Sequence, residues 1–177
     1  MLPMKRVIAL LCVLSLAAWC WAQDSKSKAS AARPDFSGNW VLDHSRSSLG
    51  ALERMLANAE ITLVIAHKEP ELKISRKASV NGREQAQILT YYSDGRGETN
   101  PAVIGSTETK TRTKWDKTKL VSDASTSLNT PRGDTIHIDT SERRELSTDG
   151  NTLTITVSIS GTPQGPQVIK QVYGRAP

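Results

Sequence analysis

The segment DFSGNWVL, residues 35–42, decides how this 177-residue chain is interpreted. Trp40 follows Gly38 by two positions, at the start of the first stretch that has the composition of a β-strand. A glycine in a strand often marks a place where another backbone or side chain approaches closely. Almost everything after Leu42 consists of short alternating runs separated by turns containing glycine, aspartate or proline. The pattern predicts an all-β domain that begins at this segment.

The residues before this segment have the composition of an export signal. Residues 1–22 combine a positive start at Lys5 and Arg6, an apolar run over 7–18 and a small residue, Ala22, at the expected cleavage position. Two alternatives remain open: lipid attachment at Cys20, for which the preceding tryptophan has the wrong shape, and an uncleaved membrane anchor. Residues 23–34 are small and polar and predict a flexible linker. We therefore expect a periplasmic or secreted domain over residues 35–177, with no membrane span in the mature chain.

Composition excludes several classes of function. The formal net charge is +5, of which Lys5 and Arg6 supply two charges, and this is too small to favour a nucleic-acid partner. Both cysteines, Cys12 and Cys20, lie in the predicted signal, which excludes thiol catalysis and cysteine metal sites in the mature chain. The absence of disulfides and of Asn-x-Ser/Thr sites favours a bacterial protein. We expect a monomer.

Hydrophobic periodicity predicts one helix and about nine strands. The three-to-four spacing of apolar residues between Ser48 and Asn58 predicts a short helix after the first strand, with Ser48 as its N-cap. Alternation then predicts strands over 61–66, 72–80, 85–92, 107–115, 120–128, 135–147, 153–160 and 167–173. Nearly all connections, such as the Asn81-Gly82 turn, are too short for a parallel crossover. The prediction is an antiparallel up-and-down barrel of about 8–10 strands, closed to remove its edges.

The Gly38-Asn39-Trp40 segment at the start of such a meander resembles the opening of the calycins, the superfamily of lipocalins and fatty-acid-binding proteins. The resemblance implies that Trp40 packs across the closed end of a barrel able to hold one small ligand. A helix after the first strand resembles the fatty-acid-binding layout. The chain also resembles a loosely defined group of small exported bacterial proteins that open with Phe-Ser-Gly-x-Trp and have largely unassigned activities.

The last strand carries the chief difference from the fatty-acid-binding pattern. Those proteins grip a ligand carboxylate with Arg-x-Tyr, and the matching residues here are Gln171-Val172-Tyr173. Because glutamine replaces the cation, a buried carboxylate would lack a compensating charge. The resemblance thus implies a neutral or weakly polar hydrophobic ligand.

Five residues are candidates for the wall of a ligand site. Tyr91 and Tyr92 are adjacent, so one faces inward and the other outward. Trp115 closes a strand of alternating threonines, and Gln171 and Tyr173 share one face of the last strand. The alternative for each aromatic residue is ordinary packing in the core.

Charged and histidine side chains give weaker signals. Lys110, Arg112 and Lys114 form one strand face, which is either a solvated surface or, if it points inward, an anion site. His137 and Asp139 share a face and would need a nearby serine to form a hydrolase triad. We expect no catalytic residue, no metal and no cofactor. The first hypothesis is a ligand-binding barrel, the second a structural or interaction protein whose barrel is filled by its own side chains, and the third a hydrolase-like enzyme.

Overall fold

The computed structural model describes residues 32–80, 82–101, 108–129 and 134–177. The predicted signal peptide, most of the predicted linker and Asn81 lie outside the described residues. Ten strands are present: β1 Gly38–Leu42, β2 Glu60–Lys68, β3 Glu71–Val80, β4 Arg83–Tyr92, β5 Glu98–Pro101, β6 Glu108–Asp116, β7 Lys119–Asn129, β8 Thr135–Leu146, β9 Thr152–Ser160 and β10 Gln167–Arg175. In the described part of the chain, no helix has the length and apolar composition needed to cross a membrane.

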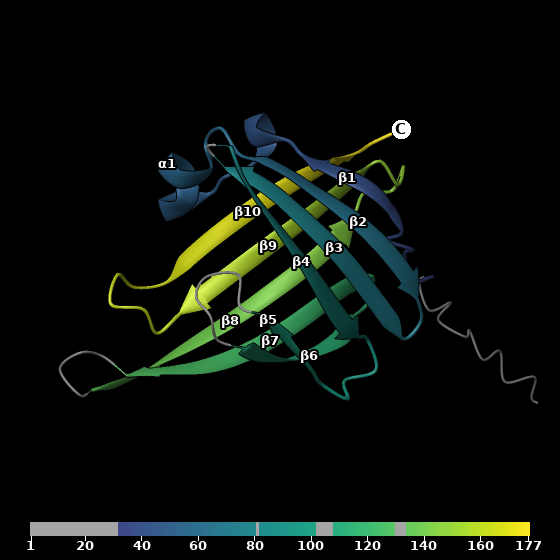
Figure 1. Cartoon of the computed structure of the whole chain (residues 1–177). Coiled ribbons are helices and arrows are strands. Elements are labelled where there is room, and N and C mark those ends of the chain that lie inside the picture. The colour runs from purple at the N-terminus through teal and green to yellow at the C-terminus, as the bar shows by residue number, and fades with distance from the viewer. Residues whose placement is uncertain (1–31, 81, 102–107, 130–133) are drawn as a thin grey trace, which may run out of the picture. The chain divides into compact units, whose positions relative to one another are not determined.

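All ten strands belong to one antiparallel sheet that curls into a nearly closed barrel (Figure 1). The order is β4-β3-β2-β1-β10-β9-β8-β7-β6-β5. Each strand therefore pairs with its sequence neighbours, except at the break between β4 and β5. The first and last strands pair with each other, Trp40 opposite Arg175 and Leu42 opposite Tyr173. The strands β4 and β5 form the two ends of the sheet and have no ladder between them. The predicted antiparallel calycin-like barrel is therefore confirmed.

Side chains of β5 hold the two ends of the sheet together along the β4–β5 seam. Asn100, only 5% exposed, accepts a hydrogen bond from the backbone nitrogen of Thr90 at 2.7 Å and donates one to its carbonyl oxygen at 2.8 Å. The Asn100 amide thereby replaces a pair of ladder bonds. Glu98 Oε2 accepts a further hydrogen bond from the Tyr92 nitrogen at 3.2 Å. The sequence pattern did not predict β5, because four residues are too few to show a period.

The helical region after β1 is shorter than predicted. Two 3-10 turns, η1 His44–Arg46 and η2 Gly50–Leu52, precede a single α-helical turn, α1 Glu53–Leu56. Ser48 does not cap a helix but forms an isolated bridge with Lys170 of β10. Leu49 and Leu56 are buried, so the apolar stripe that suggested a helix does anchor this region to the barrel.

Inward-facing side chains are fully buried at one end of the barrel and partly exposed at the other. Trp40, Leu120 and Leu153 are all 0% exposed, and they belong to a continuous apolar core. The predicted burial of Trp40 is thus confirmed, and its indole nitrogen donates a hydrogen bond to the Phe36 carbonyl at 3.0 Å. The register aligns a second, partly exposed inward row near the start of β10: Thr111, Ala124, Thr140, Ile159 and Gln167. The barrel therefore has a packed end and an accessible end.

Candidate functional site

A polar cluster lies on the inward faces of β6, β7 and β8, between the packed end and the accessible end. The Thr113 hydroxyl lies 2.7 Å from the Ser122 hydroxyl, and both residues are buried. The Glu98 carboxylate accepts hydrogen bonds from Thr111 and Thr113, each at 2.6 Å. A chain of hydrogen bonds therefore connects the β4–β5 seam with the interior of the barrel.

Arg144 of β8 is the centre of this cluster. Its side chain is 0% exposed, and Nη1 donates a hydrogen bond to the Ser122 hydroxyl at 2.8 Å. The guanidinium lies over the Tyr91 ring, with Cζ 4.0 Å from the ring centroid, which is a favourable cation–π distance. Within the described residues, Nε and Nη2 have no hydrogen-bond partner. Buried donors are nearly always satisfied in folded proteins, so Nε stands out as a buried donor, whereas Nη2 lies close to the carboxylate of Glu142.

Arg144 remains positively charged despite its burial. Burial alone would lower the pKa of Arg144, but the negative charge of Glu142 and the neighbouring Tyr91 raise it above its ordinary value. Glu142 Oε1 lies 2.9 Å from Arg144 Nη2. Burial, aided by the charge of Glu142, raises the pKa of Tyr91, so its phenol stays protonated.

The two candidates of the last strand also face inward. The Tyr173 hydroxyl, in a residue that is only 1% exposed, donates a hydrogen bond to Gln171 Oε1 at 3.1 Å. Burial raises the pKa of Tyr173 as well. Gln171 lies in the same cross-strand row as Arg144, through Ile155 of β9. The interior therefore offers a neutral amide and a neutral hydroxyl near two guanidinium groups, those of Arg144 and Arg76.

The charges inside the barrel balance. Between the ends of the described strands, two cations and two anions occupy inward-facing positions: Arg76, Arg144, Glu98 and Glu142. The inward face of β8 carries one charge of each sign, whereas that of β3 carries Arg76 alone and that of β5 carries Glu98 alone. This balance bears directly on which ligands the interior tolerates.

Two of the predicted aromatic residues lie outside this cluster. Tyr92 faces outward, where the Arg96 guanidinium lies 4.8 Å from its ring centroid, so it does not line the interior. Trp115 faces inward at the packed end, stacks on Phe36 at 5.9 Å and donates a hydrogen bond to Glu69 Oε1 at 2.8 Å. Of the five candidates, the structure thus brings Tyr91, Gln171 and Tyr173 towards the Arg144 cluster.

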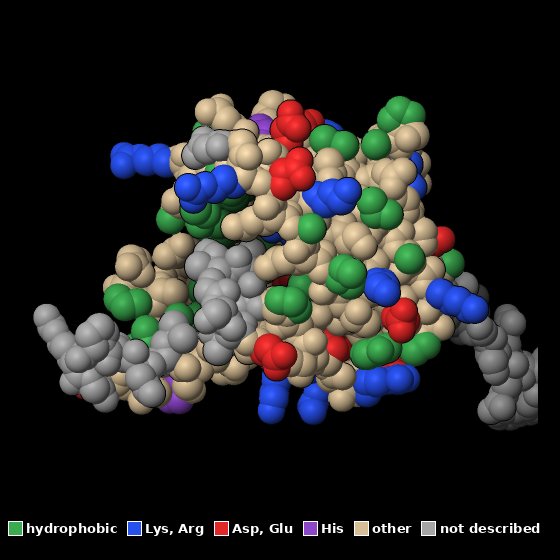
Figure 2. All heavy atoms as spheres, in the orientation of Figure 1, with side chains coloured by type: hydrophobic (Ala, Val, Ile, Leu, Met, Phe, Trp, Pro, Cys, Tyr) green, Lys and Arg blue, Asp and Glu red, His purple; other side chains and the backbone are tan. Residues whose placement is uncertain are grey.

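The charged stripe of Lys110, Arg112 and Lys114 is exposed on the outer face of β6. A cavity of about 930 Å³ is lined by residues of β5 to β10. On each of these strands the lining is centred on one residue of the partly exposed inward row, from Glu98 and Thr111 to Gln167, and includes its neighbour on either side. On the face drawn in Figure 2, hydrophobic side chains are scattered among charged ones.

The three histidines are far apart in the fold. His44 bonds to the Ala59 carbonyl, and the side chain of His67 packs at the end of β2 near Asp35 and Glu69. His137 Nδ1 lies 2.9 Å from the Ser127 hydroxyl, but both side chains are exposed on the outer surface. Among the residues that the structure covers, no group of three His, Cys, Asp or Glu side chains is arranged to hold a metal ion.

Several solved structures share the fold of this chain. No family model matches the sequence, and no curated protein matches it. A structure titled REP1-NXSQ fatty acid transporter is 19% identical, with 81% of this chain and 97% of that chain covered and a TM-score of 0.52. Human cRBP IV is 18% identical, with 81% and 99% covered and a TM-score of 0.56. Lipid binding protein 8 of Caenorhabditis elegans is 14% identical, with 80% and 95% covered and a TM-score of 0.54. The chain therefore has the calycin fold.

The sequence pattern failed to identify Arg144 and Glu142 as interior residues. They belong to a strongly charged run, Glu142 to Glu145, which is typical of a solvated strand. A signal was nevertheless present. Both have the same parity as Ile136, Ile138 and Leu146, so alternation places them on the apolar face of the strand.

Proposed function

We propose that this protein is an exported binding barrel that holds a small hydrophobic ligand whose polar group is neutral. The observation that carries the proposal is Arg144, a fully buried arginine with two nitrogens that have no hydrogen-bond partner among the described residues. Such donors suit a carbonyl, ester or hydroxyl oxygen. The fold shared with barrels named for fatty acid transport and lipid binding supports the same function.

Three features favour a neutral ligand over a free carboxylate. Gln171 occupies the position at which a cation was expected, and its amide already accepts a hydrogen bond from Tyr173. The exposed cations of β6 face away from the interior. Arg144 is accompanied by Glu142, so a second carboxylate beside it would meet a like charge.

A competition experiment tests this proposal. An environment-sensitive fluorescent fatty alcohol is titrated into the protein, and the matching acid, alcohol and methyl ester are added as competitors. The alcohol and ester are expected to displace the probe, and the acid to displace it at least about tenfold less effectively. Stronger competition by the acid contradicts the neutral-ligand proposal. Absence of any saturable binding favours the side-chain-filled barrel instead.

Export is tested on protein isolated from its own cells. Cleavage after Ala22 predicts a mature chain that starts at Gln23 and carries no lipid. Intact-mass measurement distinguishes this chain from one that begins at a diacylated Cys20. Native mass spectrometry of the same preparation identifies any small molecule that co-purifies with the barrel.

A further inference from the structure

Glu142 and Arg144 form a charge pair inside the barrel that is built from a single strand. They are two residues apart on β8, so both side chains point to the same face. Glu142 Oε1 approaches Arg144 Nη2 at 2.9 Å, and the glutamate side chain retains 26% of its exposure while the arginine has none. The carboxylate therefore lies on the more accessible side of the guanidinium.

The pair is close in distance but incomplete in hydrogen bonding. Within the described residues, the Nε and Nη2 atoms of Arg144 lack a hydrogen-bond partner, even with the Glu142 carboxylate adjacent. A guanidinium edge that presents two N–H groups matches a carboxylate in bidentate geometry. Glu142 thus neutralises the charge of Arg144 without taking up that edge.

Removal of Glu142 would leave the buried Arg144 without its closest counter-charge, with Glu98 as the remaining anion nearby. An uncompensated buried charge is strongly unfavourable, because the desolvation of the guanidinium is then not offset. A ligand carboxylate would offset it and would also satisfy the two free nitrogens. With Glu142 in place, the same ligand would add a second negative charge next to the first, close to Glu98 as well.

We propose that Glu142 is a specificity-determining residue that acts as an internal substitute for a ligand carboxylate. It supplies the counter-charge of Arg144 from within the chain, and it thereby excludes anionic lipids and admits neutral ones. Its replacement by a neutral isostere converts the barrel into a carboxylate binder. This inference rests on the proposed function, since it assumes that the ligand occupies the interior.

The test compares Glu142→Gln with the unmodified protein, using dodecanoate and methyl dodecanoate as the two probes. Glutamine keeps the size of the side chain and removes its charge. Dodecanoate affinity is expected to rise at least about tenfold in the variant, because a charge-assisted pair replaces a like-charge contact. Methyl dodecanoate affinity is expected to change much less. The matched control is Glu145→Gln on the outer side of the same strand, where the carboxylate pairs with Lys119 at 2.8 Å; its dodecanoate affinity is expected to stay unchanged.

If the Glu142→Gln variant is only marginally stable, its thermal unfolding provides a second readout. Dodecanoate is expected to raise the melting temperature of Glu142→Gln more than methyl dodecanoate does, and the order is expected to reverse in the unmodified protein. The double variant Glu142→Gln/Arg144→Met lacks the Arg144 charge and is expected to lose the preference for dodecanoate.

If the unmodified protein binds the ester but Glu142→Gln gains no dodecanoate affinity or stabilisation, the role of Glu142 is overturned and the proposed function stands. If neither protein responds to either probe, both fail.

Discussion

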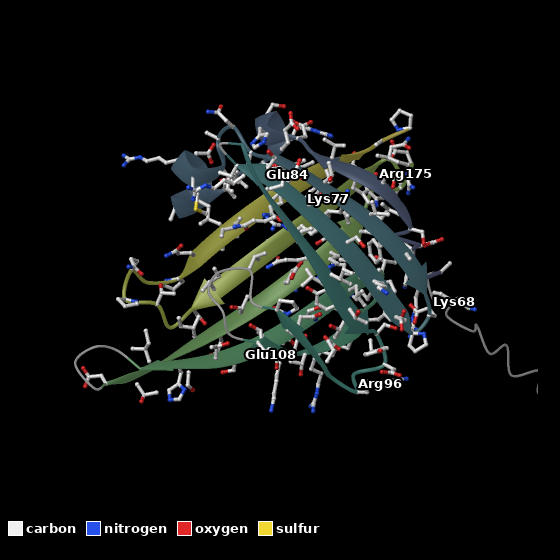
Figure 3. The ribbon with its side chains drawn as sticks, in the orientation of Figure 1. Lys68, Lys77, Glu84, Arg96, Glu108 and Arg175 are labelled. Atoms are coloured by element: carbon white, nitrogen blue, oxygen red, sulfur yellow. The ribbon has the colours of Figure 1, made fainter. Side chains whose placement is uncertain are left out.

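The guanidinium of Arg175 lies over the indole ring of Trp40, with Cζ 4.3 Å from the ring centroid. Arg175 also donates hydrogen bonds to the Ser37 carbonyl at 2.8 Å and to the Gly150 carbonyl at 2.9 Å. One side chain thus connects the first strand, the last strand and the turn before β9. It lies at the end of β10 that adjoins β1 (Figure 3). Gly38 is required here because it has a φ of 138°, and a Cβ atom would overlap the guanidinium.

Replacement of Trp40 by alanine is expected to lower the free energy of unfolding by about 3–5 kcal/mol, because the side chain is fully buried and leaves a cavity. Chemical denaturation measures the change. Val41→Ala, at the neighbouring outward position with 46% exposure, is the control and is expected to change stability by less than about 1 kcal/mol. An unchanged midpoint for the Trp40 variant would contradict the role assigned to the Gly-x-Trp segment.

Replacement of Arg175 by methionine is expected to destabilise the barrel by about 1–3 kcal/mol, because two charge-assisted hydrogen bonds and the contact with Trp40 are lost. Arg175→Lys is the informative control. Lysine keeps the charge but lacks the planar fork that reaches two carbonyls, so it is expected to recover only part of the loss. Equal stability of the lysine variant and the unmodified protein would show that charge alone matters.

Alternation and turn chemistry were sufficient to predict the antiparallel barrel, because long strands with one buried face repeat every second residue. The same rule failed for β5, a four-residue strand that pairs with β6 and whose Asn100 and Glu98 side chains bond to the backbone of β4. It also failed for the interior charges. Arg144 is stabilised in the interior by Ser122 and Tyr91 from two other strands, and cross-strand partners of this kind are not visible in local sequence.

Acid is expected to weaken the packed end of the barrel through Glu69. Partial burial raises the pKa of this carboxyl, but hydrogen bonds from Ser93 and Trp115 and the charge of His67 lower it, so that the net pKa is below its ordinary value of 4.5. Because the pKa is lower in the folded state, ionised Glu69 stabilises the fold at pH values above its ordinary pKa. This contribution is lost as the pH falls through the folded-state pKa.

This contribution is measured by denaturation of Glu69→Gln and the unmodified protein across the acid range. The stability difference between them is expected to shrink as the pH falls below about 4.5. Glu71→Gln, an exposed change two residues away, is expected to leave the acid limb of the profile unaltered. A Glu69 variant with the same pH profile as the unmodified protein would show that the carboxylate is not responsible.

Substitution of Asn100 is expected to loosen the β4–β5 seam. Asn100→Leu removes both bonds to the Thr90 backbone, so the Thr90 amide is expected to exchange its hydrogen about tenfold faster or more. Amide exchange followed by NMR measures this, with the Ile155 amide, inside the β9 ladders, as the internal reference. Equal acceleration at both amides would indicate global destabilisation and not a local opening.

The pairing of β1 with β10 has a consequence for the order in which the chain acquires its structure. Strands β2, β3 and β4 can pair as hairpins as soon as they are synthesised, because their partners are adjacent in sequence. The second edge of β1 meets its partner only when the C-terminal strand arrives, and the bond between Arg175 and Ser37 spans 138 residues. Contacts of such separation are slow to form. We therefore expect barrel closure, and with it the burial of Trp40, to occur late in folding, once the whole domain has been synthesised.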